Sequence, residues 1–276
     1  MTTSKRMWRL IQTPPSQGAW NMAIDEAILE FTAQKAVPPT LRLYSWYPAC
    51  LSLGYGQPIS DVDLESLNTK GWDVVRRPTG GRAILHTDEL TYSVCGPQTE
   101  PHLTGGVLES YQDLSFALLK ALELINIKAD PTKSVAPLTT EDKNNPVCFE
   151  VPSNYEITVH GKKLIGSAQA RKKNGVLQHG TLPLKGDLTR IIQVLIYPDE
   201  IHRQEAGRKL LDHATTVEEV LGYPGDWWIA AQAFRKAFST ILEIDLNHMG
   251  LTIEEGRRAM ELYSEKYNNP DWIEKN

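Results

Sequence analysis

The sequence predicts an α+β fold. Short alternating strand patterns fill the first two thirds of the chain, whereas the last 60 residues have the spacing of helices. This segregation favours an α+β architecture over repeated βαβ units. With 276 residues, of which 41% are hydrophobic, the chain is long enough to bury one full core.

The composition argues against several classes of protein. The net charge of −5 is opposite in sign to that of most proteins that coat nucleic-acid phosphates. Cys50, Cys95 and Cys148 are odd in number and widely spaced, which fits neither a disulfide framework nor a zinc site. No stretch reaches the roughly 18 apolar residues of a membrane span, and the N-terminus lacks a signal-peptide core. We therefore expect a cytoplasmic protein with no bound metal and neither nucleic acid nor membrane as a partner.

The first half of the chain predicts one helix followed by strands. Residues 21–31 carry apolar side chains at helical spacing, with Asn21 as a candidate N-cap. Alternating segments separated by proline and glycine then follow. The predicted strands cover residues 41–46, 50–55, 72–77, 83–86 and 90–94.

The middle of the chain predicts a long helix over residues 107–127, where apolar side chains recur every three or four positions. Residues 131–146 contain prolines and mixed charges, which indicates an exposed loop. His160, Gly161 and Lys162 indicate a hairpin turn between two strands. The predicted strands of this part cover residues 155–160, 163–170 and 176–182.

Helices are predicted again at residues 188–196 and from Thr216 onward, where the sequence Thr-Val-Glu-Glu fits a capping box. Five apolar residues of the last helical segment fall on one face, which predicts a stripe that packs into the core. The stripe consists of Trp227, Ala231, Phe234, Phe238 and Ile241.

Two features of the first half could bind a substrate. The segment 76–82 (RRPTGGR) ends a hydrophobic strand; its paired glycines let a ligand approach the backbone, and its arginines can hold a carboxylate or a phosphate. A glycine turn with solvated arginines would have the same pattern. His86 lies close to Asp88 and Glu89, so it is a candidate base, metal ligand or structural strand histidine.

Two features of the second half could carry a reaction. In the segment 163–169 (KLIGSAQ), alternation places Lys163 on a strand face with small residues, either turned inward or on a surface edge. Cys148 follows a polar loop, whereas Cys50 and Cys95 lie inside apolar alternation and resemble core residues. A cation near Cys148 would lower the pKa of its thiol and make it reactive.

In their order along the chain, these motifs resemble the biotin/lipoate protein ligase superfamily. RRPTGGR followed by His86 is similar to its RRxxGG…H motif, KLIGSAQ with Arg171 to its lysine-bearing strand, and residues 178–181 (QHGT) to the segment that follows. The closest resemblance is to the octanoyltransferases of lipoate assembly (the LipM type). Those enzymes keep a nucleophilic cysteine at the position of Cys148, 15 residues before Lys163.

The resemblance implies a mixed, mostly antiparallel sheet flanked by helices, with a helical C-terminal portion. The catalytic domain is expected over residues 1–212, with its core over about 35–212. Residues 213–276 are expected to form a helical extension packed on the same domain.

The resemblance further implies transfer of octanoyl from acyl carrier protein to the lysine of a lipoyl domain, such as the glycine cleavage H protein. The catalytic pair would be Cys148, as nucleophile, and Lys163, with no cofactor. The acyl chain would need an apolar tunnel, expected near Leu53, Ile84 and Ile165. The residues expected to bind substrate are Arg77, Gly80, Gly81, Arg82, His86, Gly166, Ser167, Gln169, Gly180 and Thr181.

Three alternatives share these motifs. An ATP- and Mg-dependent lipoate–protein ligase would use Lys163 to hold the acyl carboxylate or the adenylate phosphate, with Cys148 as a bystander. Such ligases commonly have a third glycine where this chain has Arg82, and a direct His-Asp where Thr87 follows His86. An octanoyl amidotransferase between lipoyl domains would use the same cysteine and lysine. A non-catalytic lipoyl-domain binding protein would need neither.

Both expected protein partners are usually acidic, so a local basic surface is needed for docking on a chain of net charge −5. Arg171, Lys172 and Lys173 are the first candidates. Arg76 and Arg77 are the second. A solvated hairpin turn would explain the first group equally simply.

Overall fold

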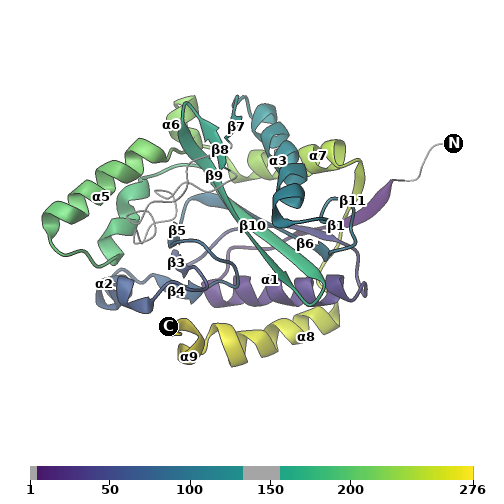
Figure 1. Ribbon diagram of the computed structural model, residues 1–276, viewed down its shortest axis with the longest axis horizontal. Coiled ribbons are helices and arrows are strands. Elements are labelled where there is room, and N and C mark those ends of the chain that lie inside the picture. The colour runs from purple at the N-terminus through teal and green to yellow at the C-terminus, as the bar shows by residue number, and fades with distance from the viewer. Residues whose placement is uncertain (1–4, 133–155, 276) are drawn as a thin grey trace.

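The computed structural model describes residues 5–132 and 156–275 (Figure 1). Its strands are β1 (Arg6–Gln12), β2 (Thr40–Tyr44), β3 (Cys50–Leu53), β4 (Asp73–Arg76), β5 (Ile84–His86), β6 (Glu89–Pro97), β7 (Asp130–Thr132), β8 (Glu156–Val159), β9 (Lys162–Lys172), β10 (Gly175–Pro183) and β11 (Ile244–His248). Its α-helices are α1 (Gly18–Ala33), α2 (Leu64–Thr69), α3 (Val107–Leu124), α5 (Glu200–His213), α6 (Val217–Leu221), α7 (Trp227–Ile241), α8 (Ile253–Leu262) and α9 (Pro270–Ile273). The 3₁₀ segments η1 (Ile59–Asp61) and η3 (Leu188–Val194) and the π-helical turn η4 (Tyr263–Tyr267) complete the described elements.

The described strands form two sheets. The main sheet has the order β11-β1-β2-β6-β10-β9-β8-β7, and the smaller one has the order β4-β3-β5. In the main sheet β1 runs parallel to β11 and β2, while the remaining neighbours are antiparallel. The predicted α+β class with a mixed, mostly antiparallel sheet is therefore confirmed.

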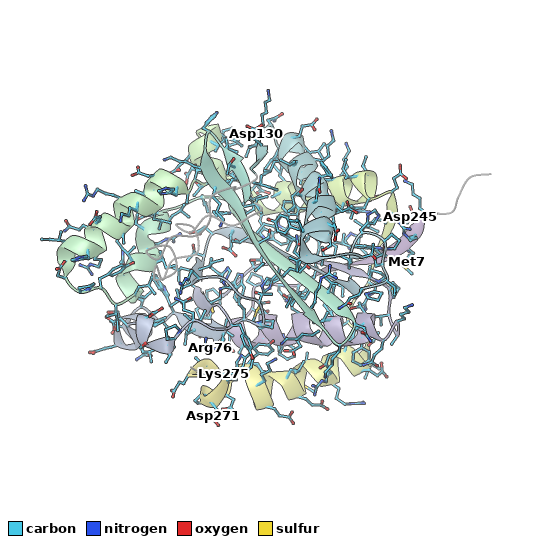
Figure 2. The ribbon with its side chains drawn as sticks, in the orientation of Figure 1. Met7, Arg76, Asp130, Asp245, Asp271 and Lys275 are labelled. Atoms are coloured by element: carbon cyan, nitrogen blue, oxygen red, sulfur yellow. The ribbon has the colours of Figure 1, made fainter. Side chains whose placement is uncertain are left out.

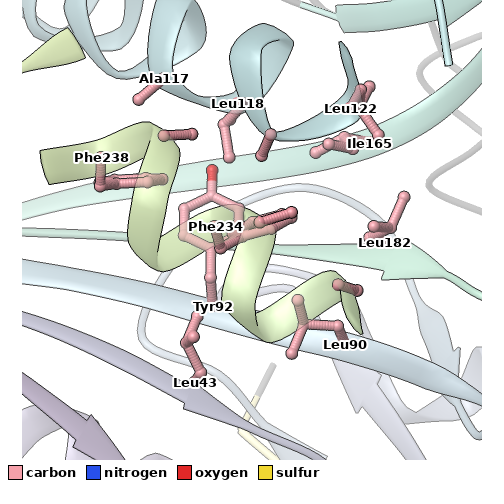
Figure 3. Close-up of a cluster of buried hydrophobic side chains, with 14 of the residues drawn as sticks. Leu43, Leu90, Tyr92, Ala117, Leu118, Leu122, Ile165, Leu182, Phe234 and Phe238 are labelled. Carbon is pink, nitrogen blue, oxygen red and sulfur yellow. The ribbon is translucent and has the colours of Figure 1, made fainter. Parts of the chain in front are cut away.

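Helices cover both faces of the main sheet. In Figure 1, α1 lies along one face with α8 outside it, and α3 and α7 lie together on the other side. Alternation along β6 serves both layers, because Tyr92 packs on α7 whereas Cys95 packs toward α1. The close-up in Figure 3 shows Tyr92 beside Phe234 and Phe238, with Leu118 of α3 nearby.

The predicted apolar stripe of α7 is buried in the core at its middle residues and exposed to solvent at its C-terminal end. Ala231, Phe234 and Phe238 are at most 1% exposed, whereas Ile241 is 38% exposed. The predicted hairpin turn also has the expected backbone geometry. His160 and Gly161 have φ angles of 51° and 78°, the left-handed pair that a tight hairpin requires.

The predicted capping box at α6 is half confirmed. The Oγ1 of Thr216 accepts a hydrogen bond from the backbone N–H of Glu219 at 3.1 Å. The carboxylate of Glu219 instead accepts from the hydroxyl of the preceding residue, Thr215, at 2.7 Å. The helix start is therefore stabilised by two consecutive threonines.

Asn21 is not a helix cap, and that prediction is wrong. Helix α1 begins at Gly18, and Asn21 is fully buried inside it. Its side-chain nitrogen donates to the carbonyl oxygens of Ser16 and Ser45, both at 3.1 Å, and its oxygen accepts from Arg42 at 2.7 Å. The asparagine thus ties the start of α1 to β2 and the residue that follows it.

Several elements were not predicted, each for a physical reason. β1 contains the fully buried Arg9, which breaks the apolar alternation; its guanidinium is satisfied by a bidentate pair with Glu255 of α8. Helix α5 is largely solvent-facing, with only Gly207 and Leu210 buried, so it lacks an apolar stripe. β11 interrupts the predicted helical C-terminal portion, because it completes the edge of the main sheet beside β1.

Candidate active site

The glycine loop, residues 77–82, is folded around the side chain of Arg77. Its guanidinium donates to the carbonyl oxygens of Gly80, at 3.0 Å, and Arg82, at 2.7 Å. The same group donates to the carbonyl oxygen of Ser52 in β3 at 2.8 Å. Arg77 is only 4% exposed, so it holds the loop against the small sheet.

The same loop makes a close backbone approach that only glycine allows. Gly81 has a φ of 95°. A Cβ added at Gly54 would lie 1.8 Å from the carbonyl oxygen of Gly81. Gly80 and Gly81 are both exposed residues.

His86 sits at the end of β5 in a chain of hydrogen-bonded groups. Its Nε2 lies 2.7 Å from the Oγ of Ser52, and its Nδ1 lies 2.7 Å from Oε1 of Glu89. Its ring stacks on Trp46, with centroids 4.0 Å apart. His86, Ser52, Glu89 and Trp46 are each at most 6% exposed, so this group is shielded from water.

Glu89 alone, of the two carboxylates predicted beside His86, contacts the imidazole. Asp88 pairs instead with Arg190, at 2.8 Å. Burial raises the pKa of the Glu89 carboxyl, but the charge and hydrogen bond of His86, with the hydrogen bond from Thr91, hold it below its usual range. Glu89 is therefore ionised at neutral pH.

His179 of β10 forms a second arrangement of this kind. Its Nε2 lies 2.7 Å from Oγ1 of Thr79 in the glycine loop, and its Nδ1 lies 3.7 Å from Oδ2 of Asp25. Burial lowers the pKa of His179, and Asp25 only partly offsets this effect. The imidazole is therefore mainly neutral at pH 7. The QHGT motif pointed to this region, but His179 itself was not predicted as a site residue.

A narrow pocket with a volume of about 30 Å³ lies between the two sheets, bordered by both histidines. Six of the ten residues expected to bind substrate line it: Arg77, His86, Gly166, Ser167, Gly180 and Thr181. The other lining residues are Met22, Tyr44, Trp46, Ser52, Ile84, Thr91, Ala168 and His179.

Strands β9 and β10 approach each other closely at the pocket. A Cβ added at Gly180 would lie 2.5 Å from the carbonyl oxygen of Gly166 and 2.6 Å from the Oγ of Ser167. The hydroxyl of Ser167 is itself 2.7 Å from that of Tyr92. The small residues of the KLIGSAQ and QHGT motifs therefore let the two strands approach each other closely beside the pocket.

Lys163 is an inward-facing residue of β9 rather than a surface lysine. It is 3% exposed and lies next to an irregularity in the pairing with β8, where Thr158 faces Lys163 and Ile157 faces Ile165. Its carbonyl oxygen accepts from the backbone N–H of Thr215 at 3.0 Å. This contact joins the lysine strand to the chain before α6.

The remaining predicted substrate residues do not line this pocket. Gly80 and Gly81 are exposed on the glycine loop, and Arg82 is half-buried beside them. The side chain of Gln169 donates to Gln178 at 3.0 Å and to Ser110 at 3.1 Å, which directs it into a polar network near α3.

Of the three residues expected to line an acyl tunnel, Ile84 borders the pocket. Leu53 and Ile165 are fully buried in hydrophobic clusters on either side and do not line it. The alternating sequence pattern predicted that Leu53 and Ile165 are buried among apolar residues. It did not predict which faces of the two sheets border the pocket. The aromatic ring of Trp46, from the segment after β2, occupies the pocket wall instead.

The second proposed docking group is wrong, because its arginines are buried. Arg76 is 0% exposed and donates to backbone carbonyl oxygens of Gly54 and of Trp272 and Ile273 in α9. Figure 2 places it beside the C-terminal segment, near Lys275. Arg77 is held inside the glycine loop.

Arg171 is also engaged with its own chain. Its guanidinium donates to the carbonyl oxygens of Leu103 and Gly106, at 3.0 and 2.9 Å, and to the Oγ of Ser110 at 2.9 Å. It therefore fastens the loop before α3 to the end of β9. Lys172 and Lys173 remain as the exposed or half-exposed cations of this turn.

Cys148 lies outside the described residues. Cys50 and Cys95 are buried core residues, as predicted. Burial, together with nearby carboxylates, raises the pKa of both thiols well above its usual range. Neither is suited to act as a nucleophile.

Residues 5–132 and 156–275 hold no group of three or more histidine, cysteine, aspartate or glutamate side chains arranged to bind a metal ion. None of the helices in these residues is both long and apolar enough to cross a membrane.

The fold and the order of the site motifs agree with comparison to known proteins. Residues 17–239 match the family model of the lipoyl protein ligase A/B catalytic domain. The chain belongs to this family. The glycine loop, strand β9 with Lys163 and the QHGT segment all lie inside the matched residues.

Relatives similar over nearly their whole length carry the name octanoyltransferase LipM. The protein from Moorella thermoacetica is 40% identical, with 97% of this chain and 98% of the relative covered. The protein from Brevibacillus brevis is 39% identical, with 96% and 98% covered, and that from Bacillus subtilis is 36% identical, with 97% and 98% covered.

Solved structures of lipoate–protein ligases share the fold. A bipartite lipoate protein ligase from Thermoplasma acidophilum, described with its E2 lipoyl domain, aligns with a TM-score of 0.82 at 24% identity, covering 98% of this chain and 96% of that one. A lipoate-protein ligase A bound with ATP aligns with a TM-score of 0.78 at 24% identity, covering 98% and 99%.

Proposed function

We propose that this family member is an octanoyltransferase that moves octanoyl from acyl carrier protein to the lysine of a lipoyl domain through a thioester on Cys148. The observation that carries this proposal is the set of relatives, 36–40% identical over nearly the whole chain, that are named octanoyltransferases. The pocket between the two sheets supports it, since it joins aromatic and aliphatic walls to a few polar groups.

The first step is attack of the Cys148 thiolate on the thioester carbonyl of the donor. The carbon–sulfur bond to the carrier breaks, and an equivalent bond to Cys148 forms. Exchange of one thioester for another is close to neutral in free energy, so the reaction needs no nucleotide and no cofactor. Backbone amides at Gly80, Gly81 or Gly166 are the candidates to hold the oxyanion, each worth about 3 kcal/mol.

Lys163 is the proposed partner of the cysteine. An ammonium group favours the thiolate form, and lowering a thiol pKa by about 1–2 units from ~8.5 corresponds to ~1.4–2.7 kcal/mol. The burial of Lys163 supports this role, because a charge shielded from water acts more strongly on its neighbours.

The acceptor in this proposal is a lipoyl-domain protein such as the glycine cleavage H protein. The structural neighbour that is described with its E2 lipoyl domain supports an acceptor of this class. The widely spaced cysteines are consistent with a cytoplasmic location for the reaction. The acceptor amine attacks the octanoyl thioester, and the resulting amide makes the second step downhill.

Intact mass spectrometry tests the proposed function directly. The protein is mixed with octanoyl–acyl carrier protein in the absence of ATP, and peptide mapping locates any adduct. We expect one octanoyl group, on Cys148, which then passes to an added lipoyl domain. An acyl group on Cys50 or Cys95 would exclude this mechanism, and a strict requirement for ATP would favour the ligase alternative.

Docking of the acidic carrier is expected to use Lys172 and Lys173. Changing both to alanine should raise the KM for octanoyl–acyl carrier protein several-fold, with the largest effect at low salt, because screening weakens charge steering beyond roughly 8–10 Å. Turnover of a small octanoyl-pantetheine thioester should not change. The matched control removes two exposed lysines elsewhere, Lys209 and Lys236. Equal losses on both substrates would mean that the pair shapes the pocket instead of docking the carrier.

A further inference from the structure

The C-terminal strap, residues 263–275, comprises the π-helical turn η4 and helix α9 and lies beyond residues 17–239, which match the family model. Its first half is tied to helix α1. Lys266 Nζ and the hydroxyl of Tyr267 both donate to the carboxylate of Glu26, and Tyr267 is fully buried. The strap is therefore anchored in the body of the protein before α9 begins.

Arg76, the last residue of β4, joins the end of the strap to the segment 54–57. It is 0% exposed, and its guanidinium donates to five carbonyl oxygens. The acceptors are those of Trp272 and Ile273 in α9 and of Gly54, Tyr55 and Gln57. Trp272 also donates, from Nε1, to the carbonyl oxygen of Arg76 at 2.9 Å. Because a buried charge needs its donors satisfied, Arg76 depends on the strap and the segment together.

The segment 54–57 packs in turn against the glycine loop. The backbone N–H of Tyr55 donates to the carbonyl oxygen of Thr79 at 2.9 Å. Gly54 lies so close to the carbonyl oxygen of Gly81 that no side chain would fit between them. A continuous series of contacts therefore runs from α9 through the segment to the loop.

The glycine loop reaches the pocket through Thr79, whose Oγ1 lies 2.7 Å from Nε2 of the pocket-lining His179. Its two adjacent glycines are exposed and allow many backbone conformations, so contacts from outside are needed to select one. We propose that the C-terminal strap holds the glycine loop in its substrate-binding conformation, with Arg76 and Trp272 as positioning residues. The effect on octanoyl transfer rests on the proposed function, whereas the effect on the order of the loop does not.

A looser loop should weaken substrate binding without slowing the enzyme once it is saturated. When only a fraction of the molecules is competent to bind, the apparent dissociation constant rises by the reciprocal of that fraction. Trp272→Ala removes the indole N–H and the ring contacts with Tyr55 and Tyr267. In single-turnover acylation of Cys148, the half-saturating concentration of octanoyl–acyl carrier protein should rise about tenfold and the maximal rate change less than about threefold. Octanoyl-pantetheine should show the same rise.

Hydrogen–deuterium exchange measures the loop itself. The backbone N–H groups of Tyr55, Gln57 and Arg77 donate to the carbonyl oxygens of Thr79, Gly54 and Leu53. In Trp272→Ala these amides should exchange at least about ten times faster, while those of α3 and β6 keep their original rates. Ile253→Ala truncates a side chain of α8 that is 77% exposed; it is the matched control and should change neither measurement.

The outcomes separate the strap from the function on which its effect rests. If the original chain never acquires octanoyl on Cys148, the proposed function fails, and exchange alone tests the strap. Unchanged exchange at these amides in Trp272→Ala would overturn the inference, because Arg77 would then be sufficient to hold the loop. Faster exchange throughout the chain, or a lower maximal rate at an unchanged half-saturating concentration, would also overturn it, since either indicates a general structural role.

Two further comparisons complete the test. A rise in the half-saturating concentration for the carrier-bound donor alone would make the strap a docking surface and overturn its role in the loop. Trp272→Phe keeps an aromatic ring but loses the N–H, so both measurements should change by only about threefold, the effect of one hydrogen bond. This variant decides the question if Trp272→Ala does not fold, and no change in its exchange would contradict the inference.

Discussion

Replacing Cys148 with alanine is expected to reduce octanoyl transfer from acyl carrier protein to a lipoyl domain by at least ~1,000-fold, as removal of a covalent nucleophile does in other enzymes. The second step has no thioester to consume once the first is lost. Cys148→Ser should be similarly inactive, because a serine hydroxyl ionises far less readily than a thiol at neutral pH. The measurement is a single-turnover assay with gel or mass detection of the octanoylated acceptor.

The other cysteines provide the control for this prediction. Cys50→Ala and Cys95→Ala remove buried thiols whose pKa values are raised well above their usual range. Both variants should keep most of the activity of the original chain if they fold. Full transfer by Cys148→Ala would refute the covalent route.

Replacing Asp25 with alanine is expected to lower the free energy of unfolding by about 3–5 kcal/mol, the usual cost of stranding one partner of a buried ion pair. Asp25 and Arg42 are both 0% exposed and are joined by a 2.7 Å hydrogen bond. The same carboxylate accepts from Tyr44 at 2.9 Å and from Ser93 at 2.8 Å. Its loss leaves a buried guanidinium and two hydroxyls without this partner.

This contribution to stability should depend on pH in a defined direction. Burial raises the pKa of Asp25, but the charge and hydrogen bond of Arg42, together with the nearby His179, more than offset this and hold it below its usual range. A carboxyl whose pKa is lower in the folded state contributes fully above its unfolded value of about 3.9. The contribution is then lost as the pH falls through the folded pKa.

Urea unfolding of the original chain and Asp25→Ala at several pH values measures both effects. The stability gap between them should shrink as the pH falls below about 4. Asp199→Ala is the control, because this exposed N-cap carboxylate should cost only about 1 kcal/mol. A gap under 1 kcal/mol at pH 7 would show that Asp25 is not central to the stability of the fold.

Local patterns were sufficient for most of the secondary structure. The helical spacing of residues 107–127 and 227–241 marked α3 and the core stripe of α7, and the turn at His160 and Gly161 marked a hairpin. Such features depend on neighbours within a few positions, which the sequence displays directly. Helix α5 was not predicted, because its surface is almost entirely exposed to solvent and carries no periodic apolar pattern.

The sequence motifs also predicted many of the residues that line the pocket. Six residues from three separate segments of the chain line one cavity between the two sheets. The partners of their side chains were not predictable in the same way. Asp88 and Glu89 are adjacent in sequence, yet only Glu89 contacts His86, because Asp88 lies in the bend between β5 and β6 and pairs with Arg190, whereas Glu89 is the first residue of β6.

By itself, the sequence determined the α+β class, the resemblance to a family and the segments that carry chemistry, since all three are written in local order and spacing. Only the tertiary structure decided that Ser52 faces His86 across two strands, that Asp25 supports His179, and that Arg76 is buried beside α9. Each of these contacts joins residues from different elements. They depend on strand register and helix packing, which are set by the whole fold and not by any local run of residues.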